Sequence, residues 1–291
     1  MISVSDEYPY YSPSSIRNFF KRSEVSIRKK WGQNFLIDPN LSVKIANSLL
    51  LECRGNILEI GPGLGVLTAQ YLKQQAEVHA VEIDPALVQE LETRFSQYKN
   101  FHLYNQDAQK FLLKLQEDDD FRRDLKIQCA GGNLPYYITS GLLTRLVLIP
   151  GILKGVFLVQ KEYALRCSAS SSESSLNVFL NNFGSWKILF NAPPSVFYPA
   201  PEVQSSIIEF SAYEKRICDA EILQKILRMS FRGKRKKIKN AWAMSDAHYS
   251  LDIMTEASAA AGISLEKRPE EIHREEYYNL VEFLQKILLK Q

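Results

Sequence analysis

The chain has little of what disulfide frameworks, metal centres and membrane spans require. Its 291 residues include only four cysteines and four histidines. The cysteines lie far apart without a Cys-x-x-Cys pair, and the histidines show no metal-ligand spacing, so we expect reduced thiols and no metal. No apolar run approaches the ~20 residues of a transmembrane helix, and the first residues lack the apolar segment of a signal peptide. These absences predict a cytoplasmic protein without membrane association.

A large net charge is also absent, because 36 basic residues against 33 acidic ones leave only +3. The basic residues are nevertheless unevenly placed. One group lies in the N-terminal arm, at Lys21–Lys30, and between Arg228 and Lys239 seven of twelve residues are Lys or Arg. A single charged run is usually a solvated face, but two runs flanking a neutral region indicate a polyanion-binding surface.

The spacing of apolar residues predicts an α/β fold with a small all-α domain behind it. From Asn56 to Phe210, short apolar runs alternate with amphipathic stretches, which is typical of βα units on a parallel sheet. After Tyr213 only helical patterns remain. We expect an N-terminal extension at 1–28, a catalytic domain at 29–213 and a helical domain at 214–291. Loops are expected at Glu117–Asp120 and in the serine-rich segment Ser168–Ser175.

Individual elements can be assigned from the same pattern. Strands are expected at Ile57–Ile60, Val78–Ile83, Phe101–Tyr104, Leu125–Ala130 and Gly155–Val159. An antiparallel addition at the sheet edge is expected from Trp186–Phe190 and Ser206–Phe210. The helices of the last domain are expected at Glu221–Phe231, Lys234–Met244, Thr255–Ala261 and Pro269–Leu289.

A glycine-rich loop follows the first expected strand directly. Its spacing is Gly-x-Gly-x-Gly, formed by Gly61, Gly63 and Gly65. Glycines let the backbone turn sharply and approach a ligand closely. Glu82 ends the next strand, where a carboxylate can accept two ribose hydroxyls, as in both nicotinamide and S-adenosylmethionine folds. Spacing alone does not choose between these two cofactors.

The residue before the loop favours S-adenosylmethionine. A nicotinamide cofactor prefers Gly-x-Gly-x-x-Gly and brings a pyrophosphate, which the carboxylate of Glu59 would repel. The cationic methionine end of S-adenosylmethionine suits that carboxylate, and this makes an oxidoreductase the weaker alternative. Asp107 is placed to accept from the cofactor's adenine amine, and it is equally expected to be a helix N-cap.

The tetrapeptide Asn133–Tyr136 (Asn-Leu-Pro-Tyr) lies between an apolar strand and an amphipathic helix. In isolation such a sequence is usually an ordinary turn. Here the Asn133 side-chain oxygen and the next backbone carbonyl would form two neighbouring acceptors, while Pro135 stiffens the turn beside an aromatic ring. This arrangement can hold an exocyclic amine by both protons, so it predicts group transfer onto a nucleobase amine.

Taken in order, these motifs resemble the ribosomal RNA adenine N6-dimethyltransferases, and among them the bacterial small-subunit enzymes. The resemblance covers roughly residues 29–289. Its motifs are Lys30–Leu36, Glu59–Gly65, Val81–Asp84, Gln106–Ala108, Asn133–Ile138, Val159–Glu162, Phe197–Ser205, and the helical segments around Phe231–Asn240 and Gly262–Glu270. The chain departs from the family in the serine-rich loop, where a Gly-Ser-Lys-x-Tyr-Gly-like stretch is usual.

The resemblance implies S-adenosylmethionine as cofactor and a role for each matching residue. The cofactor-binding residues would be Gln33, Asn34, Leu36, Glu59, Gly61, Gly63, Gly65, Glu82, Asp107, Ala108 and Asn133. The catalytic residues would be Asn133, Leu134, Pro135, Tyr136 and Phe197, with Phe197 as a second aromatic for the flipped base. The RNA-binding residues would be Arg232, Lys234, Arg235, Lys236 and Lys237.

The implied function is N6-dimethylation of two adjacent adenosines in the 3′-terminal hairpin loop of 16S ribosomal RNA. The protein would act as a monomer on small-subunit ribosomal RNA within the pre-30S particle. One alternative is the 23S ribosomal RNA adenine methyltransferase linked to antibiotic resistance, but Gly32–Asn34, Leu134 and Lys267–Glu270 favour the small-subunit enzyme. Another is a non-enzymatic assembly or transcription factor, against which the intact acidic and Asn133 motifs argue.

Overall fold

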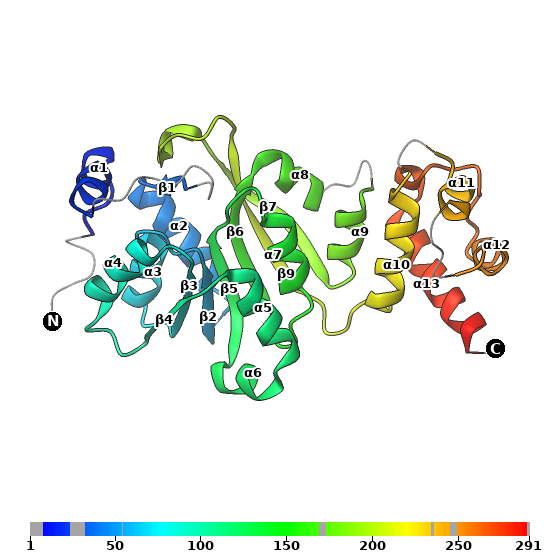
Figure 1. The fold of residues 1–291 in the computed structure, drawn as a ribbon, viewed down its shortest axis with the longest axis horizontal. Helices are drawn as coiled ribbons and strands as arrows, with labels where there is room; N and C mark the ends of the chain where they lie inside the picture. Colours follow the sequence, from blue (N-terminus) through cyan, green and yellow to red (C-terminus); the bar gives the residue numbers. More distant parts are fainter. Residues whose placement is uncertain are drawn as a thin grey trace. The chain divides into compact units, whose positions relative to one another are not determined.

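The chain folds into two compact units in a computed structural model that describes residues 8–23, 33–53, 55–168, 173–233, 236–244 and 249–289 (Figure 1). The first unit comprises 1–164 with 186–212, and the second comprises 165–185 with 213–291. Segment 165–185, which we expected in the catalytic domain, therefore belongs to the second unit. Within the described residues, no helix is both long and apolar enough to cross a membrane.

A seven-stranded mixed sheet forms the centre of the first unit, in the order β4-β3-β2-β5-β6-β9-β7. Strands β4 to β6 are parallel, and β9 pairs antiparallel with β6, as predicted for the edge addition. This confirms the predicted α/β class. The strands are β2 (Asn56–Ile60), β3 (Val78–Glu82), β4 (Phe101–Asn105), β5 (Ile127–Asn133), β6 (Lys154–Gln160), β7 (Gly184–Ala192) and β9 (Ser205–Ala212).

Helices connect these strands, and several begin at an aspartate whose side chain accepts backbone N–H groups. Asp38, Asp84 and Asp107 cap α2, α4 and α5 in this way. Such caps satisfy donors that a helix leaves open at its first turn. The helices are α2 (Pro39–Leu50), α3 (Val66–Lys73), α4 (Pro85–Phe95), α5 (Ala108–Glu117), α6 (Asp119–Leu125), α7 (Thr139–Leu146) and α8 (Lys161–Ser168).

Helix α6 corrects two predictions. The acidic segment Glu117–Asp120 was expected to be a loop, but Asp118 caps α6 by accepting from the Phe121 N–H at 2.9 Å. Leu125 was expected in a strand and instead ends α6. Lys126 then takes a left-handed conformation with φ of 48°, and β5 begins at Ile127. Local capping chemistry therefore outweighs the apolar run as a guide to where the strand starts.

The N-terminal extension contains helix α1 (Pro13–Arg22), which Ser12 caps by accepting from the Ser15 N–H. One face of α1 buries Ile16, Phe19 and Phe20. Near it, the two-residue strands β1 (Phe35–Leu36) and β8 (Phe197–Tyr198) pair antiparallel, with Leu36 opposite Phe197. The expected basic extension therefore includes a packed amphipathic helix. Residues 24–32, which contain the end of the basic group and the start of the lid motif, lie outside the described residues.

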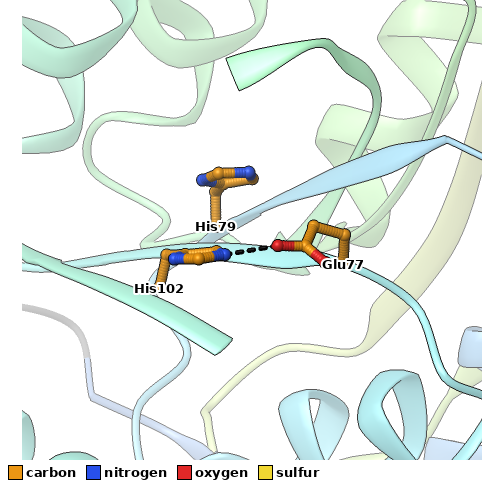
Figure 2. Close-up of side chains that lie close together, drawn as sticks. All are labelled: Glu77, His79 and His102. Atoms are coloured by element: carbon orange, nitrogen blue, oxygen red, sulfur yellow. Dashed lines mark hydrogen bonds and ion pairs between the residues drawn. The ribbon is translucent and has the colours of Figure 1, made fainter. Parts of the chain in front are cut away.

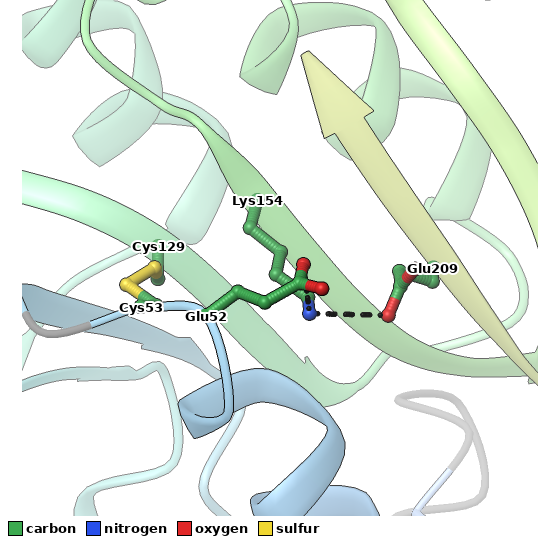
Figure 3. The surroundings of a disulfide bond; sticks show 5 residues. All are labelled: Glu52, Cys53, Cys129, Lys154 and Glu209. Carbon is green, nitrogen blue, oxygen red and sulfur yellow. Dashed lines mark hydrogen bonds and ion pairs between the residues drawn. A yellow bond between two sulfur atoms is a disulfide. The ribbon is translucent and has the colours of Figure 1, made fainter.

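Cys53 and Cys129 form a disulfide, which contradicts the expectation of four reduced thiols (Figure 3). Their Cα atoms lie 6.4 Å apart although 76 residues separate them in sequence. The sheet register explains the proximity, because Cys129 of β5 pairs with Ile57 at the start of β2. Sequence spacing cannot show a contact that strand pairing creates. Cys167 and Cys218 are both buried.

Strand pairing also gathers Glu77, His79 and His102, whose ligand-type atoms lie within 4.8 Å of one another (Figure 2). The two imidazole rings stack at 4.7 Å with 19° between their planes. Stacked rings direct their in-plane lone pairs side by side, whereas metal ligands converge on one point. His79 Nδ1 instead bonds Tyr104 Oη at 3.0 Å, and His102 Nε2 bonds Glu77 Oε1. Burial lowers the pKa of His79 to about 4, which keeps that ring neutral.

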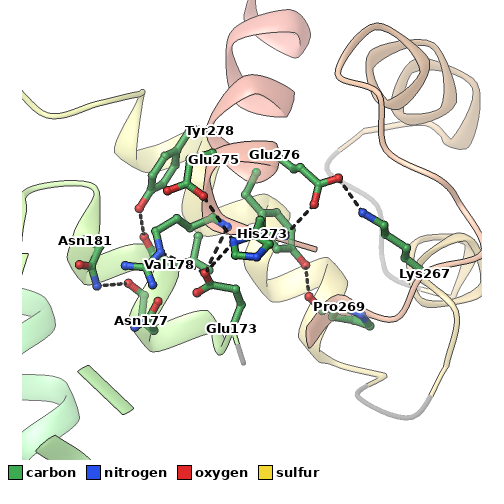
Figure 4. Close-up of polar contacts among 12 residues, drawn as sticks. Glu173, Asn177, Val178, Asn181, Lys267, Pro269, His273, Glu275, Glu276 and Tyr278 are labelled. Atoms are coloured by element: carbon green, nitrogen blue, oxygen red, sulfur yellow. Dashed lines mark hydrogen bonds and ion pairs between the residues drawn. The ribbon is translucent and has the colours of Figure 1, made fainter. Parts of the chain in front are cut away.

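The second unit is helical, as predicted for the C-terminal region. Its members are α9 (Ser175–Asn181), α10 (Ala220–Phe231), α11 (Ile238–Ala243), α12 (Leu251–Ala260) and α13 (Arg274–Leu288). Side chains connect the α9 segment to α13. Tyr278 Oη donates to the Val178 carbonyl at 2.8 Å (Figure 4). Arg274 Nε donates to Glu173 at 3.0 Å. Glu173 belongs to the serine-rich segment, of which residues 169–172 lie outside the described chain.

Candidate active site

A cavity opens at the carboxyl ends of parallel strands β2, β3 and β5, the edge where α/β sheets bind ligands. It brings together segments that are far apart in sequence. The predicted residues that line it are Gln33, Asn34, Leu36, Glu59, Gly61, Gly63, Glu82, Asp107, Ala108, Asn133 and Pro135. Of the predicted cofactor-binding residues, only Gly65 does not line the cavity.

The glycines of the loop differ in what surrounds them, as Gly61 and Gly65 show. All have positive φ: 67° at Gly61, 61° at Gly63 and 84° at Gly65. A Cβ on Gly61 would have its nearest neighbour, the Asn133 carbonyl oxygen, 3.9 Å away, so the backbone there faces open space. A Cβ on Gly65 would lie 2.6 Å from the Phe95 ring, so this glycine allows α3 to pack against α4. Gly65 does not line the cavity, and its predicted cofactor contact stays a prediction.

Glu82 ends β3 and accepts three backbone N–H groups. Its Oε1 accepts from Ile83 and Asp84 at 2.8 and 2.9 Å, and its Oε2 accepts from Gly63 at 3.2 Å. Burial raises the pKa of Glu82 to about 7, although these hydrogen bonds work in the opposite direction. The carboxyl is thus held rigidly at the cavity wall, where it can accept ribose hydroxyls.

Glu59 is 1% exposed and accepts a 2.6 Å hydrogen bond from the Thr68 hydroxyl. Burial raises the pKa of this carboxyl to about 8, the Thr68 hydrogen bond lowers it, and the charge of Glu82 raises it further. A cationic group entering the cavity would favour the ionised carboxylate by direct attraction. The free protein therefore holds a proton at Glu59 that such a ligand would displace.

Asp107 and Gln33 have structural partners while they line the cavity. Asp107 Oδ1 accepts from the N–H groups of Gln109 and Lys110 at 2.7 and 3.2 Å, as expected of an N-cap. Gln33 Nε2 donates to Asp84 Oδ2 at 3.0 Å. The cap and an adenine contact use different atoms of the Asp107 carboxylate, so the two expected roles are compatible.

Asn133 ends β5, and its side-chain orientation is fixed by the lid segment. Its Nδ2 donates to the backbone carbonyl of Asn34 at 2.7 Å. Only the nitrogen of the amide can donate to a carbonyl, so the Oδ1 atom turns the other way and remains an acceptor. The contact spans 99 residues of sequence and joins the lid motif to the tetrapeptide.

Of the other predicted catalytic residues, Pro135 lines the cavity, and Leu134 was predicted to act through its backbone carbonyl and not through its side chain. Leu134 is buried, and Tyr136 Oη bonds Ser205 Oγ at 2.7 Å; neither side chain lines the cavity. Phe197 is 3% exposed and packs in the core with Leu36, because the β1–β8 pairing turns both side chains inward. Phe197 therefore does not present a stacking face in this structure.

Sequence reasoning missed several residues that line the cavity. Tyr137 lines it and is 58% exposed, so an aromatic ring does stand at the cavity, one position after the expected Tyr136. Tyr8 and Tyr10, from the N-terminal extension, line it as well. The second tyrosine of Asn-Leu-Pro-Tyr-Tyr could have indicated Tyr137. No local pattern in the sequence connects Tyr8 to the residues of the cavity.

The cavity fits S-adenosylmethionine by its donor and acceptor set. The open space at Gly61 lets a ligand approach the backbone closely. Two buried carboxyl groups, Glu59 and Glu82, can bind a cation or accept hydrogen bonds from hydroxyl groups. Apolar walls from Leu36, Leu64 and Ile138 suit a flat base. These features match a nucleoside that carries a cationic amino-acid group.

The described members of the predicted RNA-binding group, Arg232, Lys236 and Lys237, lie around the junction of α10 and α11. Arg232 is the C-cap of α10, and Lys237 is the N-cap of α11 and pairs with Glu266. Lys236 is exposed, whereas Lys234 and Arg235 lie outside the described residues. The helix was predicted to start at Lys234, but α11 starts at Ile238. The described members of the group therefore precede α11 and do not lie along a face of it.

Comparison with known proteins gives this geometry its context. The family model for ribosomal RNA adenine dimethylase matches residues 24–286. The chain belongs to this family. The match spans the tetrapeptide, most of the C-terminal helices and the cavity lining apart from Tyr8 and Tyr10. It confirms the family predicted from the motifs.

Relatives of this dimethylase agree with the assignment over nearly their full length. The ribosomal RNA small subunit methyltransferase A of Lactococcus lactis is 35% identical over 277 residues, covering 92% of this chain and 93% of the relative. That of Caldanaerobacter subterraneus is 32% identical over 274 residues, covering 92% of this chain and 100% of the relative.

Solved structures support the fold. A dimethyladenosine transferase from Plasmodium falciparum has a TM-score of 0.71 at 22% identity, covering 87% of this chain and 98% of that one. The 23S rRNA methyltransferase ErmE has a TM-score of 0.62 at 24% identity, covering 87% of this chain and 100% of that one. At this identity the similarity concerns the architecture of the methyltransferase fold.

Proposed function

We propose that this dimethylase transfers methyl groups from S-adenosylmethionine to the N6 amines of two adjacent adenosines in the 3′-terminal hairpin loop of 16S ribosomal RNA. It acts as a cytoplasmic monomer on a small-subunit assembly intermediate. The similarity to small-subunit methyltransferases over more than 90% of the chain supports this substrate over the 23S alternative.

The observation that carries the proposal is the fixed amide of Asn133. Because Nδ2 is engaged by the Asn34 carbonyl, Oδ1 is the atom that faces an incoming amine. The Pro135 carbonyl already accepts from Ile138 N and Thr139 Oγ1, at 3.2 and 2.9 Å. The second acceptor for an amine is therefore the Leu134 carbonyl, as the tetrapeptide predicts.

The residues around the cavity perform the reaction mainly by orientation. When bound, S-adenosylmethionine supplies a methyl group on a positively charged sulfur. Asn133 Oδ1 and the Leu134 carbonyl accept the two amine protons and aim the nitrogen lone pair at that methyl carbon. Tyr137, an exposed aromatic residue of the cavity lining, stacks on the unstacked adenine, which an RNA loop releases more readily than a duplex. The basic residues near α10 and α11 hold phosphates without reading sequence.

The test is Asn133→Ala, with cofactor binding and methyl transfer measured separately. Removing the amine acceptor is expected to lower methyl transfer to a 16S hairpin by about 100-fold or more. Affinity for S-adenosylhomocysteine should change by less than about tenfold, because Glu59, Glu82 and Asp107 remain. Asn279→Ala, at an exposed asparagine of the second unit, serves as the matched control. Methyl transfer close to the wild-type rate would contradict the amine-clamp role.

A further inference from the structure

The N-terminal segment Tyr8–Ser23, called the strap here, packs against the parts of the chain that form the cavity. Helix α1 places Ile16, Phe19 and Phe20 in a buried cluster whose other members include Phe35, Leu64 and Leu87. Phe35 belongs to the lid, Leu64 to the glycine loop and Leu87 to the helix after Glu82. The strap thus joins three cavity segments through a shared apolar contact.

Tyrosines at the start of the strap reach the cavity itself. Tyr8 Oη donates to the Leu64 carbonyl, within the glycine loop, at 3.1 Å. Tyr8 and Tyr10 line the same cavity as Glu59 and Gly61. The Tyr8 ring meets the rings of Tyr10 and Tyr11 edge-on, with centroids 5.8 and 4.7 Å away. These contacts hold the Tyr8 ring as a wall of the cavity.

Further hydrogen bonds join the strap residues after Tyr8 to three helices of the first unit. Tyr10 Oη donates to Glu90 Oε1 at 2.7 Å on α4. Gln70 Nε2 of α3 donates to Tyr11 Oη at 3.0 Å, and Tyr11 Oη also bonds Ser42 Oγ of α2 at 3.3 Å. Three helices of the first unit therefore hold residues 10 and 11, which positions Tyr8 between them and the glycine loop.

We propose that the strap is part of the cofactor site and that the Tyr8 ring contacts the cationic amino-acid end of bound S-adenosylmethionine. The inference rests on the proposed cofactor. Glu59 supplies a negative charge to that end, and an aromatic face beside it adds cation–π attraction and excludes water. Because the strap contacts the lid and the glycine loop, cofactor binding and strap packing stabilise each other.

The variant that tests this contact is Tyr8→Ala, assayed by calorimetric binding of S-adenosylhomocysteine, which keeps the amino-acid end, and of adenosine, which lacks it. Affinity for S-adenosylhomocysteine should fall by about 3- to 30-fold, while affinity for adenosine should change by less than about twofold. Tyr8→Phe keeps the ring and should lose less. Tyr213→Ala, an exposed tyrosine of the second unit, is the matched control.

Hydrogen exchange of the wild-type protein provides a second readout that does not depend on a variant folding. Amides of α1 should exchange at least about threefold more slowly when S-adenosylhomocysteine is bound. Unchanged exchange of α1, or S-adenosylhomocysteine affinity of a folded Tyr8→Ala within about twofold of wild type, would overturn the strap's role. Failure of the wild-type protein to bind S-adenosylhomocysteine at all would contradict the proposed function instead.

Discussion

Glu59 and Glu82 place two buried carboxyl groups in one cavity, and burial raises the pKa of each, to about 8 and about 7. The unfolded chain would release these protons near pH 4.5. The folded free protein keeps them to higher pH, so their contribution to stability is fully present below pH 4.5 and is lost as the pH rises through 7 and 8. The cavity thus holds protons in the free state, and a cation can replace the one at Glu59.

Cofactor binding is therefore expected to release a proton from Glu59. At pH 7 the buried carboxyl is mostly protonated, and the cationic end of the ligand favours its ionised form. Calorimetry with S-adenosylhomocysteine in buffers of different ionisation enthalpy should show release of close to one proton, and affinity should rise with pH up to about 8. Glu59→Gln should remove most of the release, whereas the exposed control Glu92→Gln should keep it. A binding enthalpy that does not depend on the buffer would refute this assignment.

For single residues, the sequence indicated which side chains line the cavity better than it indicated the direction in which an aromatic ring points. Glu59, Glu82, Asp107 and Asn133 could be selected because acids and amides have few substitutes in these tasks, and all four line the cavity. The Phe197 side chain is buried, because the direction of an aromatic ring depends on strand pairing that no local pattern specifies. Its role beside a flipped base stays a prediction. The predicted stacking position is better filled by Tyr137.

The glycine loop shows how one element combines two requirements. Gly61→Ala and Gly65→Ala share the cost of a left-handed conformation, about 1–2 kcal/mol. Gly65→Ala also drives a methyl group into Phe95 and Leu91, at 2.6 and 2.9 Å, which adds about 1–3 kcal/mol of overpacking. Urea unfolding should therefore rank Gly65→Ala as the less stable variant, and cofactor binding should suffer more in Gly61→Ala. Equal losses of stability would contradict the separate roles.

Elements were predictable where hydrophobic periodicity and caps agree. The strands from Asn56 to Gln160 and the capped helices α2 and α4 follow directly from those signals. Helix α6 was missed because its seven residues are mostly charged and bury no side chain completely. The disulfide was missed because it depends on the register of β2 against β5, which is a property of the assembled sheet.

The whole molecule combines a catalytic unit with a helical unit that carries basic side chains. Replacing Lys236 and Lys237 by Ala should reduce the slope of log affinity against log salt by about 1 for each phosphate that is no longer neutralised, when binding of a 16S hairpin is measured. Lys73→Ala with Lys99→Ala, two exposed lysines of the first unit, is the matched control. An unchanged slope would mean that these lysines form only a solvated face.

Long-range organisation was the least accessible part of the sequence. Segment 165–185 joins the helical unit through Glu173–Arg274 and Tyr278–Val178, contacts that span about 100 residues. The N-terminal extension was expected only to carry basic residues for a polyanion, yet its described part reaches the cavity by packing on loops far along the chain. Only the assembled fold shows such contacts, because each partner alone looks like an ordinary polar or apolar residue.

The central claim is that this dimethylase modifies small-subunit ribosomal RNA. Mass spectrometry of that RNA from cells lacking the protein, beside cells complemented with wild type or Asn133→Ala, tests it most directly. We expect N6-dimethyladenosine to disappear from the 3′-terminal hairpin, to return with the wild-type protein and to stay absent with Asn133→Ala. Unchanged dimethyladenosine in cells that lack the protein would contradict it.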